Sequence, residues 1–141
     1  MLMVFLVNCL VVALVVMIHY ECLYRLTRLL PNLRFAHRYR LVVGVFGAMV
    51  AHAVEVWIFG AAYYLMNARH NWGYLEGDIH GSLLDCVYFS FSVYTTLGFG
   101  DIVPQGDMRY LTGIEALTGL VLITWTASFL YLEMQRNWST G

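Results

Sequence analysis

Three apolar runs, each long enough to cross a lipid bilayer, constrain this chain more than any other feature. They cover residues 1–20, 41–66 and 110–133. A helix needs about 20 apolar residues to cross a hydrocarbon core of about 30 Å. The sequence therefore predicts an all-α integral membrane protein with three transmembrane helices: an extra N-terminal helix, an outer helix and an inner helix.

The composition excludes a soluble enzyme. Of the 141 residues, 60% are hydrophobic and only 12% are charged, whereas about a quarter of the residues of a soluble domain are charged. The length leaves no room for a separate soluble domain beside three spans. The first run lacks the basic start and small-residue cleavage site of a signal peptide, so we expect it to remain as a membrane helix.

The arginines set the expected orientation. Five of the eight basic residues, all arginines, lie between residues 25 and 40, and short arginine-rich loops stay on the cytoplasmic side. We therefore expect 21–40 to be a basic cytoplasmic loop, 134–141 to be a short cytoplasmic tail, and the N-terminus and 67–109 to lie outside. The same side chains are candidates for contact with anionic lipid headgroups, with topology-setting charge as the simpler alternative: Arg25, Arg28, Arg34, Arg38 and Arg40.

A short apolar segment and a glycine-containing loop lie between the second and third runs. Residues 83–95 are too few to cross the membrane and indicate a re-entrant helix, and 96–101 read Thr-Leu-Gly-Phe-Gly-Asp. Irregular backbone at membrane depth leaves carbonyl groups without partners, and a dehydrated cation supplies them. Gly98 and Gly100 allow successive carbonyls to point to one axis, and Thr96 adds a hydroxyl oxygen.

The loop resembles the selectivity filter of potassium channels, whose usual form is Thr-Val-Gly-Tyr-Gly-Asp. The resemblance covers roughly residues 41–133. It implies a homotetramer with one pore loop per chain, passive K⁺ conduction and no cofactor or nucleic-acid partner. The ion-binding residues that it implies, through the first four carbonyls and the threonine hydroxyl, are Thr96, Leu97, Gly98, Phe99 and Gly100.

The loop departs from the usual pattern at three places. Leu97 replaces Val, Phe99 replaces Tyr and so lacks the hydroxyl that braces the filter, and Ser92 stands where some members carry a Glu that pairs with the aspartate after the filter. Asp101 therefore needs another partner, and Tyr88 stands where the family often has Trp. The residues expected to support the filter are Thr95, Asp101, Ser92, Tyr88 and Glu115.

Ionisable side chains inside apolar runs are costly and suggest function. His52 and Glu55 share one helical face three residues apart, which fits either helix packing or a pH-sensing, gating role. Glu115 is expected to brace the filter or the short helix from behind, with a pore-lining position as the alternative. Gly119 fits a gating hinge or close packing, and His19 is expected to be an interfacial residue rather than a metal ligand.

The sequence thus favours a potassium-selective channel in a cell membrane. Two alternatives remain open, a weakly selective cation channel and a non-conducting membrane subunit of another complex. No span carries arginine at every third position, so no voltage sensor is expected.

Overall fold

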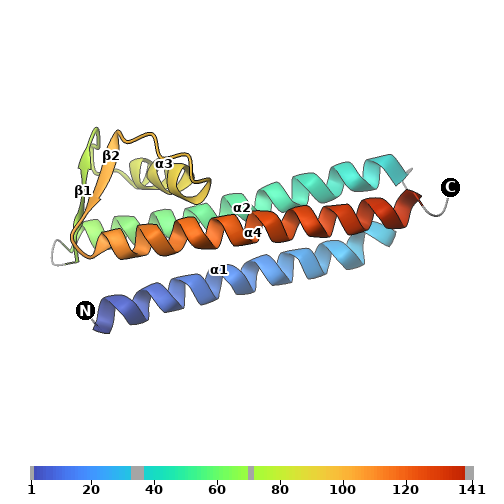
Figure 1. The fold of residues 1–141 in the computed structure, drawn as a ribbon, viewed down its shortest axis with the longest axis horizontal. Coiled ribbons are helices and arrows are strands. Elements are labelled where there is room, and N and C mark those ends of the chain that lie inside the picture. The colour runs from blue at the N-terminus through green and yellow to red at the C-terminus, as the bar shows by residue number, and fades with distance from the viewer. Residues whose placement is uncertain (1, 33–36, 70–71, 139–141) are drawn as a thin grey trace.

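A computed structural model describes residues 2–32, 37–69 and 72–138, with the backbone alone at 37–38 and 137–138. Three long helices run side by side: α1 (Leu2–Leu29), α2 (His37–Asn67) and α4 (Met108–Trp138) (Figure 1). All three are long and apolar enough to span a membrane, which confirms the predicted membrane protein with three transmembrane helices. The two chain ends lie at opposite ends of the bundle (Figure 1), as three crossings require.

The helices extend into the segment that was expected to be a basic loop. α1 continues past Tyr20 to Leu29 and ends in a 3₁₀ turn, η1 (Leu30–Asn32), and α2 begins at His37. The Glu21 carboxylate pairs with Arg25 one turn later, at 2.7 Å, and such pairs stabilise a helix. The expected loop 21–40 is therefore helical over much of its described part.

The segment between α2 and α4 contains a short helix and two strands. Helix α3 (Leu83–Tyr94) lies between β1 (Tyr74–Gly77) and β2 (Ile102–Gln105) along the chain. The strands pair antiparallel, with Tyr74 opposite Gln105 and Gly77 opposite Ile102. They join the chain before α3 to the chain that follows the glycine-containing loop. The sequence predicted the short helix and missed the strands.

The start of α3 is fixed by a capping box. The Asp85 amide donates to Ser82 Oγ at 3.1 Å, and the Ser82 amide donates to the Asp85 carboxylate at 3.1 Å. The bond from the Ser82 amide also holds the pKa of the Asp85 carboxyl below its usual value. Two backbone donors that have no partner within the helix are thereby satisfied.

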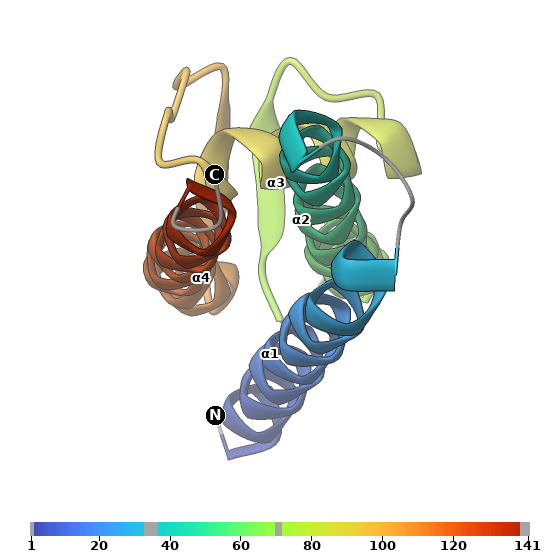
Figure 2. The same cartoon turned by 90° about the vertical axis from the view of Figure 1, so that its right-hand side faces the viewer.

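Helix α3 packs against α2 and α4, and α1 lies on the other side of that pair (Figure 2). The approach of α2 to α3 is very close at Gly60, where an added Cβ would lie 2.7 Å from Val87 Cγ2 and 2.8 Å from its Cα. Small residues permit such contacts between membrane helices. The short helix is thus held against the two spans that flank it in sequence.

Candidate functional site

Backbone amides of the glycine-containing loop donate hydrogen bonds to carbonyls in the last turn of α3. The Thr96 amide donates to Val93 O at 2.8 Å, and the amides of Leu97 and Gly98 both donate to Ser92 O, at 2.9 and 3.1 Å. No described peptide bond is cis. In a trans peptide the carbonyl points opposite to the amide hydrogen of the next residue. The carbonyls of Thr96 and Leu97 are therefore turned away from α3.

Alternate residues of the loop have left-handed backbone conformations. The φ angles are 59° at Thr96, 55° at Gly98 and 81° at Gly100. Glycine adopts such angles at little cost, whereas a threonine does so rarely. The sequence pointed to the two glycines and missed Thr96, whose residue type carries no signal of this conformation.

The loop is largely bare in the single chain. Leu97 and Phe99 are each 61% exposed, and a Cβ added at Gly98 or Gly100 would meet no atom within 4 Å.

The partner of Asp101, which the sequence left open, is Tyr88. The Tyr88 hydroxyl donates to Asp101 Oδ2 at 2.7 Å, and this bond to a carboxylate raises the pKa of Tyr88 above its usual value. The Tyr88 ring also stacks on Phe99, with 6.1 Å between ring centres and 4° between planes. Tyr88 thus connects α3 to both of these loop residues.

The two hydroxyl residues near the end of α3 bond to their own helix. Thr95 Oγ1 donates to Phe91 O at 2.7 Å, and Ser92 Oγ donates to Phe89 O at 2.9 Å. The Ser92 side chain therefore turns back to the helix, and its contribution to the loop is its backbone carbonyl.

Glu115 lies behind α3 and is fully buried in the single chain, so the pore-lining alternative is wrong. Its two carboxylate oxygens accept hydrogen bonds from Tyr63 of α2 and Ser90 of α3, each at 2.5 Å. Ser90 Oγ also lies 2.9 Å from Val56 O of α2. One carboxylate therefore connects α4, α2 and the middle of α3.

Glu55 is the centre of a second buried cluster, which includes the last residue of α3. His19 Nδ1 lies 2.8 Å from Glu55 Oε1, and His52 Nδ1 lies 3.0 Å from Glu55 Oε2. Tyr94 donates to Glu55 Oε2, and Thr126 Oγ1 lies 3.0 Å from His52 Nε2. The interfacial placement expected for His19 is wrong. Helix α1 continues beyond it to Leu29, and the imidazole is completely buried.

Gly119 of α4 lies directly against the end of α3. An added Cβ would overlap the carbonyl oxygen of Tyr94 and lie 3.0 Å from its carbonyl carbon. The structure therefore gives Gly119 a close-packing contact, and the hinge stays a prediction.

The structure describes the side chains of three of the five arginines that the sequence suggested as lipid contacts. Arg25 and Arg28 are exposed, with Arg25 on Glu21 and the Arg28 guanidinium 4.5 Å from the centre of the Tyr24 ring. Arg40 is half-buried. Arg34 lies outside the described residues, as does the side chain of Arg38.

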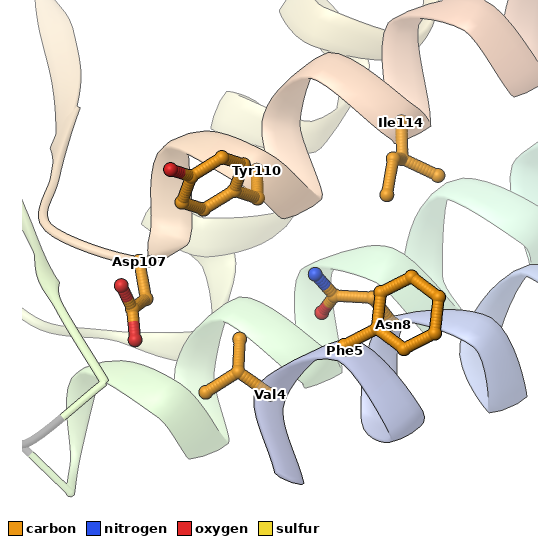
Figure 3. Close-up of a pocket in the computed structure, with 6 residues that line it drawn as sticks. All are labelled: Val4, Phe5, Asn8, Asp107, Tyr110 and Ile114. Carbon is orange, nitrogen blue, oxygen red and sulfur yellow. The ribbon is translucent and has the colours of Figure 1, made fainter. Parts of the chain in front are cut away.

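A separate pocket of about 310 Å³ lies between the first turns of α1 and the start of α4. Figure 3 shows Asn8 there among mostly apolar side chains. Among the described residues, no group forms a hydrogen bond with Asn8 Oδ1, although it is buried. The residues that line the pocket are Val4, Phe5, Asn8, Asp107, Tyr110 and Ile114.

The structure thus shows a membrane protein in which a short helix packs against two spans and is followed by a loop with outward-turned carbonyls. The chain belongs to the ion channel family, whose match covers residues 51–136. This family assignment confirms that the chain is a channel protein and not an enzyme. Most of α2, all of α3 and the loop, and nearly all of α4 lie within the match, whereas α1 lies outside it.

Three relatives of this chain have names that identify them as potassium channels. The chain is 30% identical over 94 residues to the inward rectifier potassium channel Kirbac3.1 of Paramagnetospirillum magnetotacticum, covering 62% of this chain and 32% of the relative. It is 31% identical over 58 residues to the potassium channel protein kcv of Paramecium bursaria Chlorella virus 1, covering 41% and 62%. It is 39% identical over 49 residues to the TWiK family of potassium channels protein 18 of Caenorhabditis elegans, covering 34% and 11%.

The chain therefore spans less than two thirds of the length of each of these relatives. No solved structure is a significant match.

Proposed function

We propose that four copies of this chain form a potassium-selective channel, in which four loops surround one axis and K⁺ diffuses passively along it. The observation that carries the proposal is the pair of hydrogen bonds from the Leu97 and Gly98 amides to Ser92 O. These bonds turn the carbonyls of Thr96 and Leu97 away from α3, toward the open side of the loop. The carbonyls of Gly98 and Phe99 and the Thr96 hydroxyl complete the proposed ion ligands, and Gly100 gives the loop its last left-handed residue.

The tetramer follows from the chemistry of the ion. A dehydrated K⁺ needs a shell of oxygens from four loops, and one chain supplies one loop. The exposure of Leu97 and Phe99 supports burial against neighbouring copies. All three relatives reported above are named as potassium channels, which supports K⁺ as the ion.

The proposed orientation places the loop segment outside and the arginine-rich turn between α1 and α2 in the cytoplasm. Five of the nine acidic residues lie between 76 and 107, and an acidic mouth concentrates cations. On the opposite side, we propose that the exposed Arg25 and Arg28 lie near anionic headgroups.

We propose packing roles for Gly119 and for the pair of His52 and Glu55. Gly119 lies too close to the Tyr94 carbonyl for a side chain, and His52 and Glu55 both contact the Tyr94 hydroxyl. These contacts support a fixed position for the end of α3 during conduction.

The test is a reversal potential. Purified protein is reconstituted in planar bilayers with K⁺ on one side and Na⁺ on the other. A reversal potential close to the K⁺ limit is expected. A potential near zero, with current present, would instead establish the weakly selective cation channel.

A substitution in the loop tests the proposed filter directly. Gly98→Ala is expected to abolish flux while the tetramer still forms, because alanine does not easily keep a φ of 55°. The matched control is Gly113→Ala, at a helical glycine where an added Cβ meets nothing within 4 Å. Unchanged flux in Gly98→Ala would overturn the filter, and a chain that cross-links only to other proteins would favour the non-conducting subunit.

A further inference from the structure

We propose that His19, His52 and Glu55 bind a divalent transition-metal ion of the Zn²⁺ type, next to the Tyr94 hydroxyl. The site lies among α1, α2 and the end of α3. It is distinct from the loop proposed to bind K⁺, and it does not depend on conduction.

The three donor groups lie close together. One nitrogen of each imidazole and one oxygen of the carboxylate all lie within 4.8 Å of one another. Two imidazoles and one carboxylate form a common zinc donor set, and zinc takes four ligands in tetrahedral geometry at about 2.0–2.2 Å. These three residues leave the fourth position for a water molecule, beside the Tyr94 hydroxyl, which lies 2.9 Å from His52 Nδ1.

The far side of both imidazoles faces a single hydroxyl. Thr126 Oγ1 lies 3.4 Å from His19 Nε2 and 3.0 Å from His52 Nε2. If both Nδ1 atoms carry their hydrogens toward Glu55, the one hydroxyl hydrogen of Thr126 serves only one of the two Nε2 acceptors.

Metal binding at both Nδ1 atoms resolves this mismatch. The imidazole hydrogens then lie on Nε2, and both N–H groups donate to the two lone pairs of Thr126 Oγ1. Histidines that bind a metal usually donate their second N–H to such an acceptor, which fixes the tautomer and the ring orientation. Thr126 is therefore placed as the orienting partner of both ligands.

The charge of the cluster also favours a cation. Glu55 is fully buried within a membrane span, and the ion-pairing groups that reach it in the described part of the chain are the two imidazoles. A buried carboxylate is costly unless a positive charge compensates it. A divalent ion supplies that charge.

A metal ion here would join α1, which lies outside the family match, to α2, next to the end of α3. His19 belongs to α1, and Tyr94 is the last residue of α3. Bound metal is therefore expected to stabilise the docking of α1 onto the other helices. Metal binding raises the free energy of unfolding by mass action, because the unfolded chain has no such site.

The experiment uses the full chain, purified in detergent, stripped with a chelator and titrated with Co²⁺ as a spectroscopic substitute for Zn²⁺. We expect one Co²⁺ per chain, an intense visible spectrum typical of tetrahedral coordination, and a higher unfolding temperature with Zn²⁺. His19→Gln is expected to weaken binding more than about tenfold, and Thr126→Val to weaken it by about 10–100-fold. The control His80→Gln removes an exposed imidazole outside the cluster and is expected to leave binding unchanged.

A second variant gives a gain of signal. His19→Cys is expected to keep the metal and to add a thiolate-to-cobalt charge-transfer band in the near ultraviolet. No saturable binding, binding that is lost in His80→Gln, or equal binding by His19→Gln and the parent chain would overturn the site. These outcomes leave the potassium channel untouched, because metal binding is measured without conduction.

Discussion

Two buried carboxylates hold the short helix α3, and they do so with different chemistry. Glu115 of α4 accepts hydrogen bonds from two hydroxyls, those of Tyr63 and Ser90. Glu55 of α2 contacts two imidazoles as well as the Tyr94 hydroxyl. Both carboxylates are fully buried, so each depends on its partners to remain in an apolar environment.

The difference follows the division of the chain into the part within the family match, residues 51–136, and helix α1, which lies outside it. The partners of Glu115 all lie between residues 51 and 136, within the family match, and they hold the middle of α3. Glu55 also reaches His19 of α1, which lies outside that match, and it holds the end of α3. The hydroxyl groups on Glu115 thus connect helices within the matched part of the chain, and the contact of Glu55 with the His19 imidazole connects that part to α1.

Replacing Glu115 is expected to have the largest effect. Glu115→Ala removes the carboxylate that accepts from the buried Tyr63 and Ser90 hydroxyls, which keep only Thr112 Oγ1 and Val56 O as neighbours, and opens a cavity, at a cost of about 3 kcal/mol. Thermal unfolding of the protein in detergent measures the loss. Glu115→Gln keeps the volume and one acceptor oxygen, so it should lose less. Equal stability of the alanine variant and the parent would contradict the bracing role.

The contact between α4 and the end of α3 is tested by two glycines of the same helix. Gly119→Ala forces a Cβ onto the Tyr94 carbonyl and is expected to cost about 3 kcal/mol, as overpacking does. Gly113→Ala, where the Cβ meets open space, is expected to stabilise the helix by up to about 1 kcal/mol. If both variants changed stability alike, the close contact would not govern this position.

The two tyrosines sharpen the comparison of the carboxylates. Tyr63→Phe leaves one Glu115 oxygen without the donor it has in this structure, at a cost of about 2 kcal/mol. Tyr94→Phe leaves the equivalent Glu55 oxygen with His52 at 3.0 Å, so the expected cost is about 1 kcal/mol. Denaturant titration of both variants gives the ratio. The reverse order would indicate that the imidazoles do not compensate for a lost hydroxyl.

The parts of the fold that the sequence predicted depend on short stretches of chain. A run of apolar residues fixes each span, and the lead-in helix 83–95 with Gly98 and Gly100 after it indicates the loop. Each of these signals is readable without knowing what packs against it. The position of Glu115 against α3 was also expected, since a carboxylate inside a span needs a partner nearby.

The parts that the sequence missed depend on distant pairings. His19 and Glu55 are 36 residues apart, and His19 looked interfacial because the apolar run ends at Tyr20, whereas the helix continues to Leu29. The two strands are four residues each, with Pro104 inside the second, which is too short for a pattern of alternation. No local feature marks Tyr88 as the partner of Asp101.

The smallest expected effect concerns that last contact, which lies on the exposed surface. The bond from Tyr88 to the Asp101 carboxylate raises the pKa of Tyr88, so folding favours the neutral phenol. The contribution of the hydrogen bond between Tyr88 and Asp101 to stability is complete below the ordinary tyrosine pKa of about 10. This contribution is lost as the pH rises through the raised pKa of Tyr88. The difference in ultraviolet absorbance between the parent and Tyr88→Phe should therefore titrate with a midpoint above about 10.

Asp101→Asn tests the cause of this shift. The amide oxygen still accepts the hydrogen bond, which is the largest cause of the raised pKa, but it lacks the charge that also disfavours a phenolate, so the midpoint of Tyr88 is expected to fall only part of the way toward its ordinary value. An unchanged midpoint would mean that the carboxylate does not act on the phenol. The carboxylates that hold α3 would then be the buried pair alone, and Asp101 would not fix the loop to Tyr88 by its charge.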